Sequence, residues 1–146
     1  MSRTESAGRT IHELMIHLDV AGDTNALAVM HESGITLPQI VTLVQLQRDG
    51  AMALSPIAER LRLSLSATSS LVQRLVEQER VTRTEDPDDR RQKRIELTRA
   101  GAVLIERLQL ERVSALGRGA SKLPAPLRAE LLDVAARVVA HLRGHA

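Results

Sequence analysis

The chain has 146 residues, of which 43% are apolar and 26% charged, so it is long enough for one domain with an apolar core. It contains no cysteine and no aromatic residue, which excludes disulfides, thiolate catalysis, cysteine–zinc sites and base stacking on aromatic side chains. The net charge is only +2, yet ten of the 20 basic residues lie between residues 55 and 99, which favours a local basic contact surface. If this surface binds nucleic acid, we expect double-stranded DNA.

No apolar run approaches the length that spans a membrane. The N-terminal stretch MSRTESAGRTIHE lacks the apolar segment of a signal peptide. We therefore expect a cytoplasmic protein that has no membrane partner.

The first 35 residues predict a helical region. Apolar residues recur at helical spacing from Ile11 to Leu18. We expect the helix to continue to Met30, with Gly22 as a site for a kink, and to end at Gly34.

A second helix is expected to begin at Thr36 as its N-cap, with Pro38 in its first turn. The turn Asp49-Gly50 should close it. The apolar face of this helix is expected to hold Ile40, Leu43, Val44 and Gln47.

Residues 52–54 then read as a minimal strand, and Ser55-Pro56 as the N-cap and first residue of a third helix. Its apolar side should hold Ile57, Ala58 and Leu61. Residues 63–65 predict a tight turn that buries one leucine, and Ser66 is expected to begin a fourth helix. The buried side of that helix should hold Thr68, Leu71, Val72 and Leu75, and the pair predicts a helix-turn-helix.

A β-hairpin is predicted next. Residues 81–85 are rich in β-branched side chains, and residues 94–97 alternate between polar and apolar. Between them lies DPDDRRQ, a turn-forming Asp-Pro followed by opposite charges. The strands should bury Ile95 and Leu97 and leave the charged tip in solvent.

The C-terminal third predicts two helices. Thr98 is the expected N-cap of a long helix that contains Leu104 and Ile105, LPAPL is a connector, and a last helix extends to Leu142. The apolar stripes of the terminal helices are longer than the small middle lobe can cover. We therefore expect a homodimer, in which a second copy covers them.

The order of these elements resembles the winged helix-turn-helix regulators of the multiple-antibiotic-resistance (MarR) family. The stretches that carry the resemblance are LSPIAERLRLSLSATSSLVQRLVEQERVTR and DPDDRRQKRIELTRAG, the second of which is similar to the family's wing signature. The chain departs from the family at Glu79-Arg80, where a glycine turn is usual, so this helix must end without glycine. It also lacks the aromatic residues that ligand pockets of the family often use.

The resemblance implies a mainly α fold with a small β-hairpin wing. We expect an N-terminal dimerisation helix at 1–35, a winged helix-turn-helix DNA-binding lobe at 36–99, and C-terminal dimerisation helices at 100–146. The implied function is a sequence-specific regulator of transcription, a ligand-responsive repressor that binds a pseudo-palindromic operator as a homodimer. The sequence holds no catalytic constellation, so we do not expect an enzyme. The alternative is a winged-helix protein-interaction module without an operator.

The exposed side of the fourth helix is the first candidate for DNA contact. Small hydroxyl side chains allow a helix to sit deep in the major groove, Gln73 can pair with adenine, and Arg74 can reach guanine or phosphate. The candidate residues are Ser66, Ala67, Ser69, Ser70, Gln73 and Arg74. The resemblance places Ser66, Ser69, Ser70 and Arg74 at DNA-facing positions. The alternative interpretation is a solvated helix face.

The hairpin tip is the second candidate. Arg90 and Arg91 could enter the narrow minor groove, whose negative potential favours guanidinium. Asp86 and Asp89 could brace the tip, because a carboxylate can fix one arginine in a bidentate pair. We expect Arg90 to contact DNA and Asp89 to brace Arg91, although the two arginines could exchange roles. The alternative is a tip that is only solvated.

The resemblance also implies a small anionic or amphipathic effector. The polar candidates for its binding on the first helices are His12, His17, His31 and Arg48. The stretch HELMIH looks like a zinc-protease motif, but its histidines are five residues apart and therefore about 140° apart around a helix. We expect no metal site and no cofactor.

Overall fold

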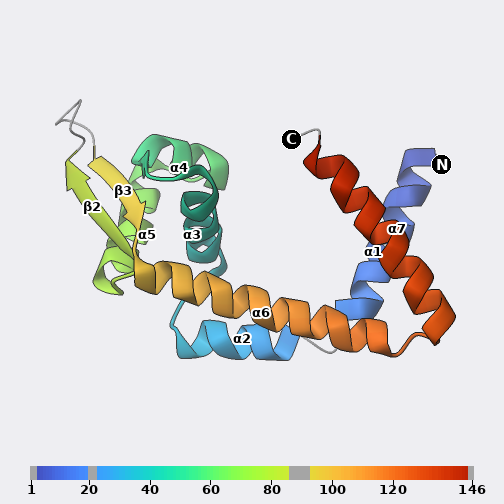
Figure 1. Ribbon diagram of the computed structural model, residues 1–146. Helices are drawn as coiled ribbons and strands as arrows, with labels where there is room; N and C mark the ends of the chain where they lie inside the picture. The colour runs from blue at the N-terminus through green and yellow to red at the C-terminus, as the bar shows by residue number, and fades with distance from the viewer. Residues whose placement is uncertain (1–2, 20–22, 86–92, 145–146) are drawn as a thin grey trace. The chain divides into compact units, whose positions relative to one another are not determined.

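The computed structural model describes residues 3–19, 23–85 and 93–144 (Figure 1). The fold is mainly helical with a small three-stranded antiparallel sheet, as the sequence predicts. In chain order the elements are α1 (Arg3–Asp19), α2 (Asp23–Glu32), α3 (Leu37–Asp49), β1 (Met52–Ala53), α4 (Leu54–Leu61), α5 (Leu65–Glu77), β2 (Val81–Glu85), β3 (Lys93–Leu97), α6 (Arg99–Ser121) and α7 (Ala125–Arg143).

The chain divides into two compact units. One consists of residues 1–26 and 111–146, and the other of residues 27–110. Helices α2 and α6 contribute residues to both units. The three-part division at residues 35 and 99 stays a prediction.

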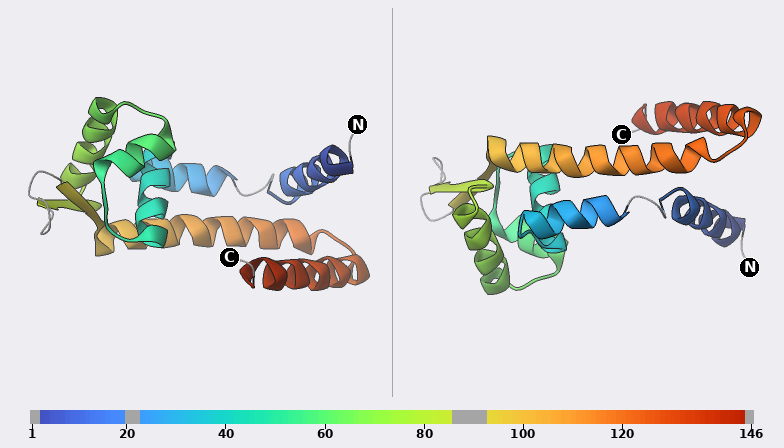
Figure 2. Two further views of the ribbon diagram at one scale, coloured as in Figure 1. Left: turned by 90° about the horizontal axis from the view of Figure 1, so that it is seen from above. Right: turned by 90° about the horizontal axis from the view of Figure 1, so that it is seen from below.

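The predicted hairpin is confirmed. Strand β3 lies between β1 and β2, with Val81 opposite Leu97 and Met52 opposite Ile95. Val81 and Ile95 are buried, and Leu97 packs against the core. Figure 2 shows the hairpin at the edge of its unit beside α5.

The core of the 27–110 unit is built from aliphatic side chains alone, because the chain has no aromatic residue. Every helix of the unit contributes to it, and close packing of branched side chains replaces the bulk that rings would supply. Its most deeply buried apolar residues are Leu43, Leu46, Ile57, Val72, Leu75, Val81, Ile95, Leu104 and Ile105.

Two predicted helix starts are wrong by one or two residues. Helix α4 begins at Leu54 after an N-cap at Ala53, so Pro56 is the third helical residue. Proline is tolerated there because the first N–H groups of a helix have no intrahelical partner. Helix α5 begins at Leu65, and the hydroxyl of Ser64, rather than Ser66, accepts from the N–H of Ala67 at 3.1 Å.

Two predictions of burial are also wrong. On α3, Leu43 is buried, but Val44 and Gln47 are exposed, and Leu46 is buried in their place. The buried side of α3 is therefore rotated relative to the predicted stripe. In the turn before α5, Leu63 and Leu65 are both exposed, so neither leucine is buried.

Helices α2, α4 and α5 end in the same hydrogen-bonded geometry. Each places one residue in the left-handed region, at Gly34 (φ +59°), Arg62 (φ +54°) and Glu79 (φ +58°). The two bonds of a Schellman motif follow in each case, for example from the N–H of Arg80 to the carbonyl of Leu75 at 2.8 Å and from Glu79 to Val76 at 2.9 Å. The prediction that Gly34 ends its helix is confirmed, whereas α4 and α5 end without glycine.

In the other unit, α1 and the end of α6 approach closely. A Cβ on Gly119 would overlap the carbonyl oxygen of Leu18. Glycine is therefore required here because there is no room for a side chain, not because of an unusual backbone conformation. Helix α7 buries none of its described side chains within the protomer. Its LPAPL connector is shorter than predicted, because the helix already begins at Ala125.

No single described helix is long and apolar enough to cross a membrane. One bent pair, Asn25–Glu32 with Leu37–Asp49, passes by length and composition only, with a bend of 93°. The apolar side chains of this pair include Leu43 and Leu46, which belong to the core described above.

Candidate nucleic-acid interface

Helix α5 is anchored by the side that the sequence predicts. Thr68, Val72 and Leu75 are fully buried, and Leu71 packs against the core. The buried hydroxyl of Thr68 donates to the carbonyl oxygen of Ser64 at 2.9 Å, so this polar group is satisfied. The opposite side of α5 therefore faces away from its own unit.

Most of the predicted DNA-facing residues are exposed on that outer side. The exposed ones are Ser66, Ala67, Ser70, Gln73 and Arg74, and Ser69 is half-buried. The small residues at the N-terminal end leave the backbone of the first turns open to a groove. The hydroxyl of Ser70 donates to the carbonyl of Ser66 at 3.2 Å and can still accept a bond.

Gln73 is partly fixed in place. Its Nε2 donates to Oε1 of Glu77 at 3.1 Å, one helical turn away. Glu77 and Arg74 are the charged residues of α5, so this helix carries no net charge. Contacts to phosphate must therefore come largely from basic residues outside α5.

The residues expected at the wing tip lie outside the described residues. These are Asp86, Asp89, Arg90 and Arg91. The strands below them are described, and a salt bridge of 3.1 Å joins Lys93 to Glu85 at their last pair. The base of the wing is thus held by both backbone and side chains.

The predictions did not include three exposed basic residues of the 27–110 unit. Arg62 occupies the turn before α5, Arg83 lies on β2 and Arg94 on β3, and all three are exposed. Arg94 pairs with Thr84 in the register, on the face of the hairpin opposite Ile95. The alternation of polar and apolar residues in β3 could have identified it, whereas no sequence signal marks the left-handed backbone of Arg62.

The proposed effector residues are not joined to one another. His12 and His17 lie on α1, and Arg48 lies in the other unit with His31. Among the described residues, no hydrogen bond or ion pair links any two of the four. The Nδ1 atom of His17 lies 2.8 Å from the carbonyl oxygen of Glu13, to which it can donate.

Arg48 is already paired. Its Nε and one terminal nitrogen donate to the two carboxylate oxygens of Asp49 at 2.7 and 2.8 Å, and Arg60 lies 3.6 Å from the same carboxylate. The hydrogen bond from Arg48 lowers the pKa of Asp49, and it raises the pKa of Arg48 in turn. An anion that used Arg48 would have to compete with this carboxylate.

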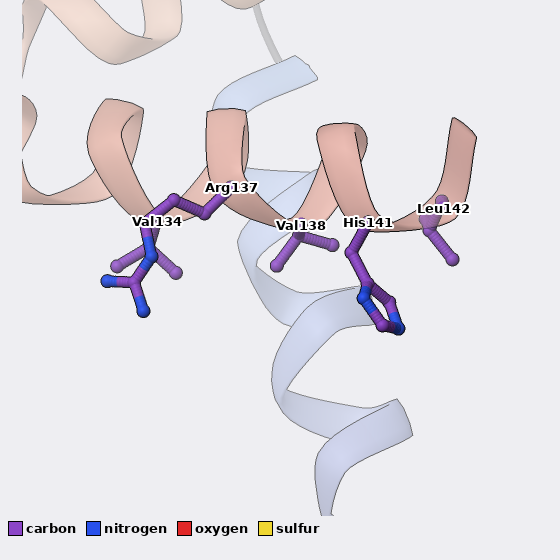
Figure 3. A pocket seen from close by; sticks show the side chains of 5 residues that line it. All are labelled: Val134, Arg137, Val138, His141 and Leu142. Atoms are coloured by element: carbon purple, nitrogen blue, oxygen red, sulfur yellow. The ribbon is translucent and has the colours of Figure 1, made fainter. Parts of the chain in front are cut away.

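A shallow hollow runs along one face of α7 (Figure 3). Its lining residues are Val134, Arg137, Val138, His141 and Leu142, which recur at the spacing of one helix face. In the described part of the chain, no group of three His, Asp or Glu side chains could hold a metal ion.

The MarR family profile matches residues 35–93 of this chain. A 92-residue stretch is 31% identical to the HTH-type transcriptional repressor MdtR of Bacillus subtilis, and it covers 63% of this chain and 59% of MdtR. Residues 35–93 are therefore similar to the MarR family of regulators. The chain spans about three fifths of the length of the curated relatives that it matches.

Solved structures of similar proteins extend the match over nearly the whole chain. The transcriptional regulator Tm0710 of Thermotoga maritima is 25% identical, with a TM-score of 0.82 over 97% of this chain and 96% of Tm0710. The YusO protein of Bacillus subtilis is 27% identical, with a TM-score of 0.69 over all of both chains. Members of this family are transcriptional regulators, not enzymes.

Proposed function

We propose that this chain is a sequence-specific, double-stranded DNA-binding regulator of transcription that acts as a homodimer. The observation that carries the proposal is the exposed face of α5, which presents Ser66, Ser70, Gln73 and Arg74 on a helix whose other side is buried. These are donors and acceptors that can read base edges in the major groove.

The hairpin β2–β3 would supply the second contact. In a winged helix-turn-helix complex, the two recognition helices enter successive major grooves about 34 Å apart. The wings would reach the flanking minor grooves through Arg90 or Arg91. The operator is then expected to be pseudo-palindromic, because a two-fold dimer presents the same surface twice.

The dimer is supported by the exposed apolar side chains of the terminal helices. α1 exposes Ile11 and Ile16, and α7 exposes Leu132, Val138 and Leu142. A 19-residue helix that buries none of its described side chains gains little stability from its own protomer. A second copy would cover this surface, including the hollow of Figure 3.

We further propose that the protein is a repressor released by a small anionic or amphipathic effector. MdtR is named a transcriptional repressor, and we extend that role to this chain. The effector would favour a dimer in which the recognition helices have the wrong spacing for DNA. With no aromatic residue in the chain, its pocket would have aliphatic walls and a few polar groups.

The test is selection of bound duplexes from a random library with the purified full-length protein. A shared pseudo-palindromic sequence among the selected duplexes is expected. Six or more phosphate contacts per dimer would give a log–log salt slope of about −5 or steeper. No enrichment and a flat salt response would favour the alternative, a module that docks onto another protein.

A further inference from the structure

Residues Gln78–Arg80 lie at the C-terminal end of α5, which is the proposed recognition helix. They combine three energetically unfavourable features. Glu79 adopts φ +58°, which L side chains rarely adopt. The Oε1 atom of Gln78 and the Nε atom of Arg80 are buried without a hydrogen-bond partner in the described part of the chain. A segment of this kind persists only where the surrounding structure holds it in place.

One support comes from the end of α2. The Nε2 atom of Gln78 donates to the carbonyl oxygen of Gly34 at 3.0 Å. Gly34 is itself the left-handed residue that ends α2. The ends of α2 and α5 are therefore joined directly.

The other support comes from the start of α6, where Thr98 has three roles. Its hydroxyl donates to the carbonyl oxygen of Glu79 at 2.7 Å, and its backbone N–H donates to the carbonyl of Arg80 at 3.1 Å. The hydroxyl oxygen also accepts from the N–H of Gly101 at 3.0 Å, which caps α6. Arg80 returns a bond to the carbonyl of Ala100 at 3.1 Å.

The two supporting helices share a property. α2 and α6 both contribute residues to the two compact units, whereas α5 belongs to one unit alone. A helix transmits a rotation along its length because its backbone bonds make it stiff. A shift of α2 or α6 would therefore reach the recognition helix at its C-terminal end.

We propose that Gln78–Arg80 is a strained joint that α2 clamps through Gly34 and α6 clamps through Thr98, and that Thr98 is a positioning residue for DNA recognition. The clamps hold Glu79 in its left-handed conformation and so set the direction of α5. When the clamp from α6 is released, the end of α5 relaxes and its outer face no longer matches the groove. The part that concerns DNA rests on the proposed function.

The first test needs no DNA. Thr98→Val removes the hydroxyl at nearly constant volume, and Thr98→Ser keeps it. We expect amide hydrogen exchange at Glu79 and Arg80 to speed up by about fivefold to tenfold in Thr98→Val, as the loss of one hydrogen bond would produce. Thr98→Ser should exchange as the wild type does, and the core amide of Leu43 should not change. Unchanged exchange at Glu79 and Arg80 would overturn the proposal.

Thr98→Val also removes the cap of α6, which could loosen the whole fold. Gln78→Met provides the second variant, because it removes the bond to Gly34 and leaves α6 untouched. If Leu43 exchanges faster in Thr98→Val, the proposal is judged on Gln78→Met, where faster exchange at Glu79 and Arg80 alone supports it. Unchanged exchange there contradicts it.

The second test measures affinity for a duplex that the wild type selects and for a random-sequence duplex of equal length. We expect both variants to weaken the selected duplex about tenfold and the random duplex less than about twofold, because phosphate contacts stay in place. The fold-loss of affinity for the selected duplex in the double variant should be smaller than the product of the two single fold-losses, because both clamps act on one joint. The proposal would be overturned if the affinity losses of the two variants were independent, or if each variant lost the same affinity for both duplexes. If the wild-type protein binds no duplex more tightly than the random-sequence duplex, the proposed function is wrong. The proposal of a strained joint is then tested by hydrogen exchange alone.

Discussion

The first turn of α6 lies directly against the end of the recognition helix, because Gly101 meets the carbonyl oxygen of Arg80. A Cβ at position 101 would overlap that oxygen and would crowd a methyl group of Leu97. Gly101 is buried. Glycine is needed here for close approach of two backbones, not for an unusual φ.

Gly101→Ala should therefore destabilise the fold even though alanine favours a helix. We expect the free energy of unfolding to fall by about 1–3 kcal/mol, the usual cost of an added group in a packed site. Urea denaturation of the full chain measures it.

Gly117→Ala is the matched control on the same helix. Nothing lies within 4 Å of a Cβ at Gly117, so only helix propensity should change. This variant should gain about 1 kcal/mol. Equal stability of the two variants would show that the crowding at Gly101 is relieved by a small movement of α6.

Glu79→Gly should stabilise the protein. A residue with a side chain costs about 1–2 kcal/mol in the left-handed conformation, and glycine avoids this cost. Part of the gain is offset because glycine has more conformational freedom in the unfolded chain. The free energy of unfolding is therefore expected to rise by about 0.5–1 kcal/mol. Urea denaturation again provides the measurement.

The control for Glu79→Gly is Gly34→Ala, the reverse change at the same backbone geometry. A Cβ at Gly34 meets only Nε2 of Gln78 at 3.8 Å, so its cost is conformational rather than steric. We expect it to lower stability by about 1 kcal/mol. A loss of stability in Glu79→Gly would mean that the side chain of Glu79 makes a favourable interaction larger than the strain.

The sequence predicts the parts of this fold that depend on side-chain type. Alternation in β3 predicts a buried Ile95, and a hydroxyl before a long helix predicts Thr98 as a cap; both are confirmed. Prediction from the sequence fails where two nearby residues have the same side chain. Ser64 and Ser66 could each cap a helix, and in the structure Ser64 does so. The left-handed Arg62 and Glu79 could not be predicted, because their residue types disfavour this conformation. At Glu79 a bond from the distant Thr98 supports it, whereas the bonds at Arg62 are local.

The protein should sediment as a dimer at micromolar concentration, because α1 and α7 expose apolar side chains that a second copy would cover. Val138→Asp places a charge on the apolar side of α7 and should shift the equilibrium toward the monomer. Sedimentation velocity distinguishes the two species.

Ala140→Asp introduces the same charge on the polar side of α7, where the exposed Asp133 also lies, and should leave the dimer intact. A stable 16.0 kDa species in the wild type would contradict the dimer. So would equal behaviour of the two variants.

Arg90→Ala should weaken binding to a selected duplex with little effect on stability. One lost arginine contact typically costs about 1–3 kcal/mol of binding free energy. Asp89→Ala should cost less, because it would act by loosening the tip. Fluorescence anisotropy on a labelled duplex measures each variant, and thermal unfolding checks that the fold is unchanged. If Arg91→Ala weakens binding and Arg90→Ala does not, the roles of the two arginines are exchanged.

The release of DNA should depend on a bound ligand and not on thiol oxidation. The chain has no cysteine, so no residue can form a reversible sulfenic acid or disulfide with peroxide. Its methionines can be oxidised, but this is a slower and less specific reaction.

An effector pocket without aromatic walls should favour an anionic amphiphile, which aliphatic side chains cover while a few cationic groups orient its charge. We expect small anionic amphiphiles to release a labelled selected duplex at micromolar to millimolar concentration in an anisotropy titration, and dilute peroxide to leave it bound. His12→Ala, His17→Ala, His31→Ala and Arg48→Ala would then show which polar group serves the ligand. Arg48 should respond least, because Asp49 already occupies its guanidinium. Rapid release by dilute peroxide that a thiol reductant reverses would refute this prediction, since this chain has no group that could perform that chemistry.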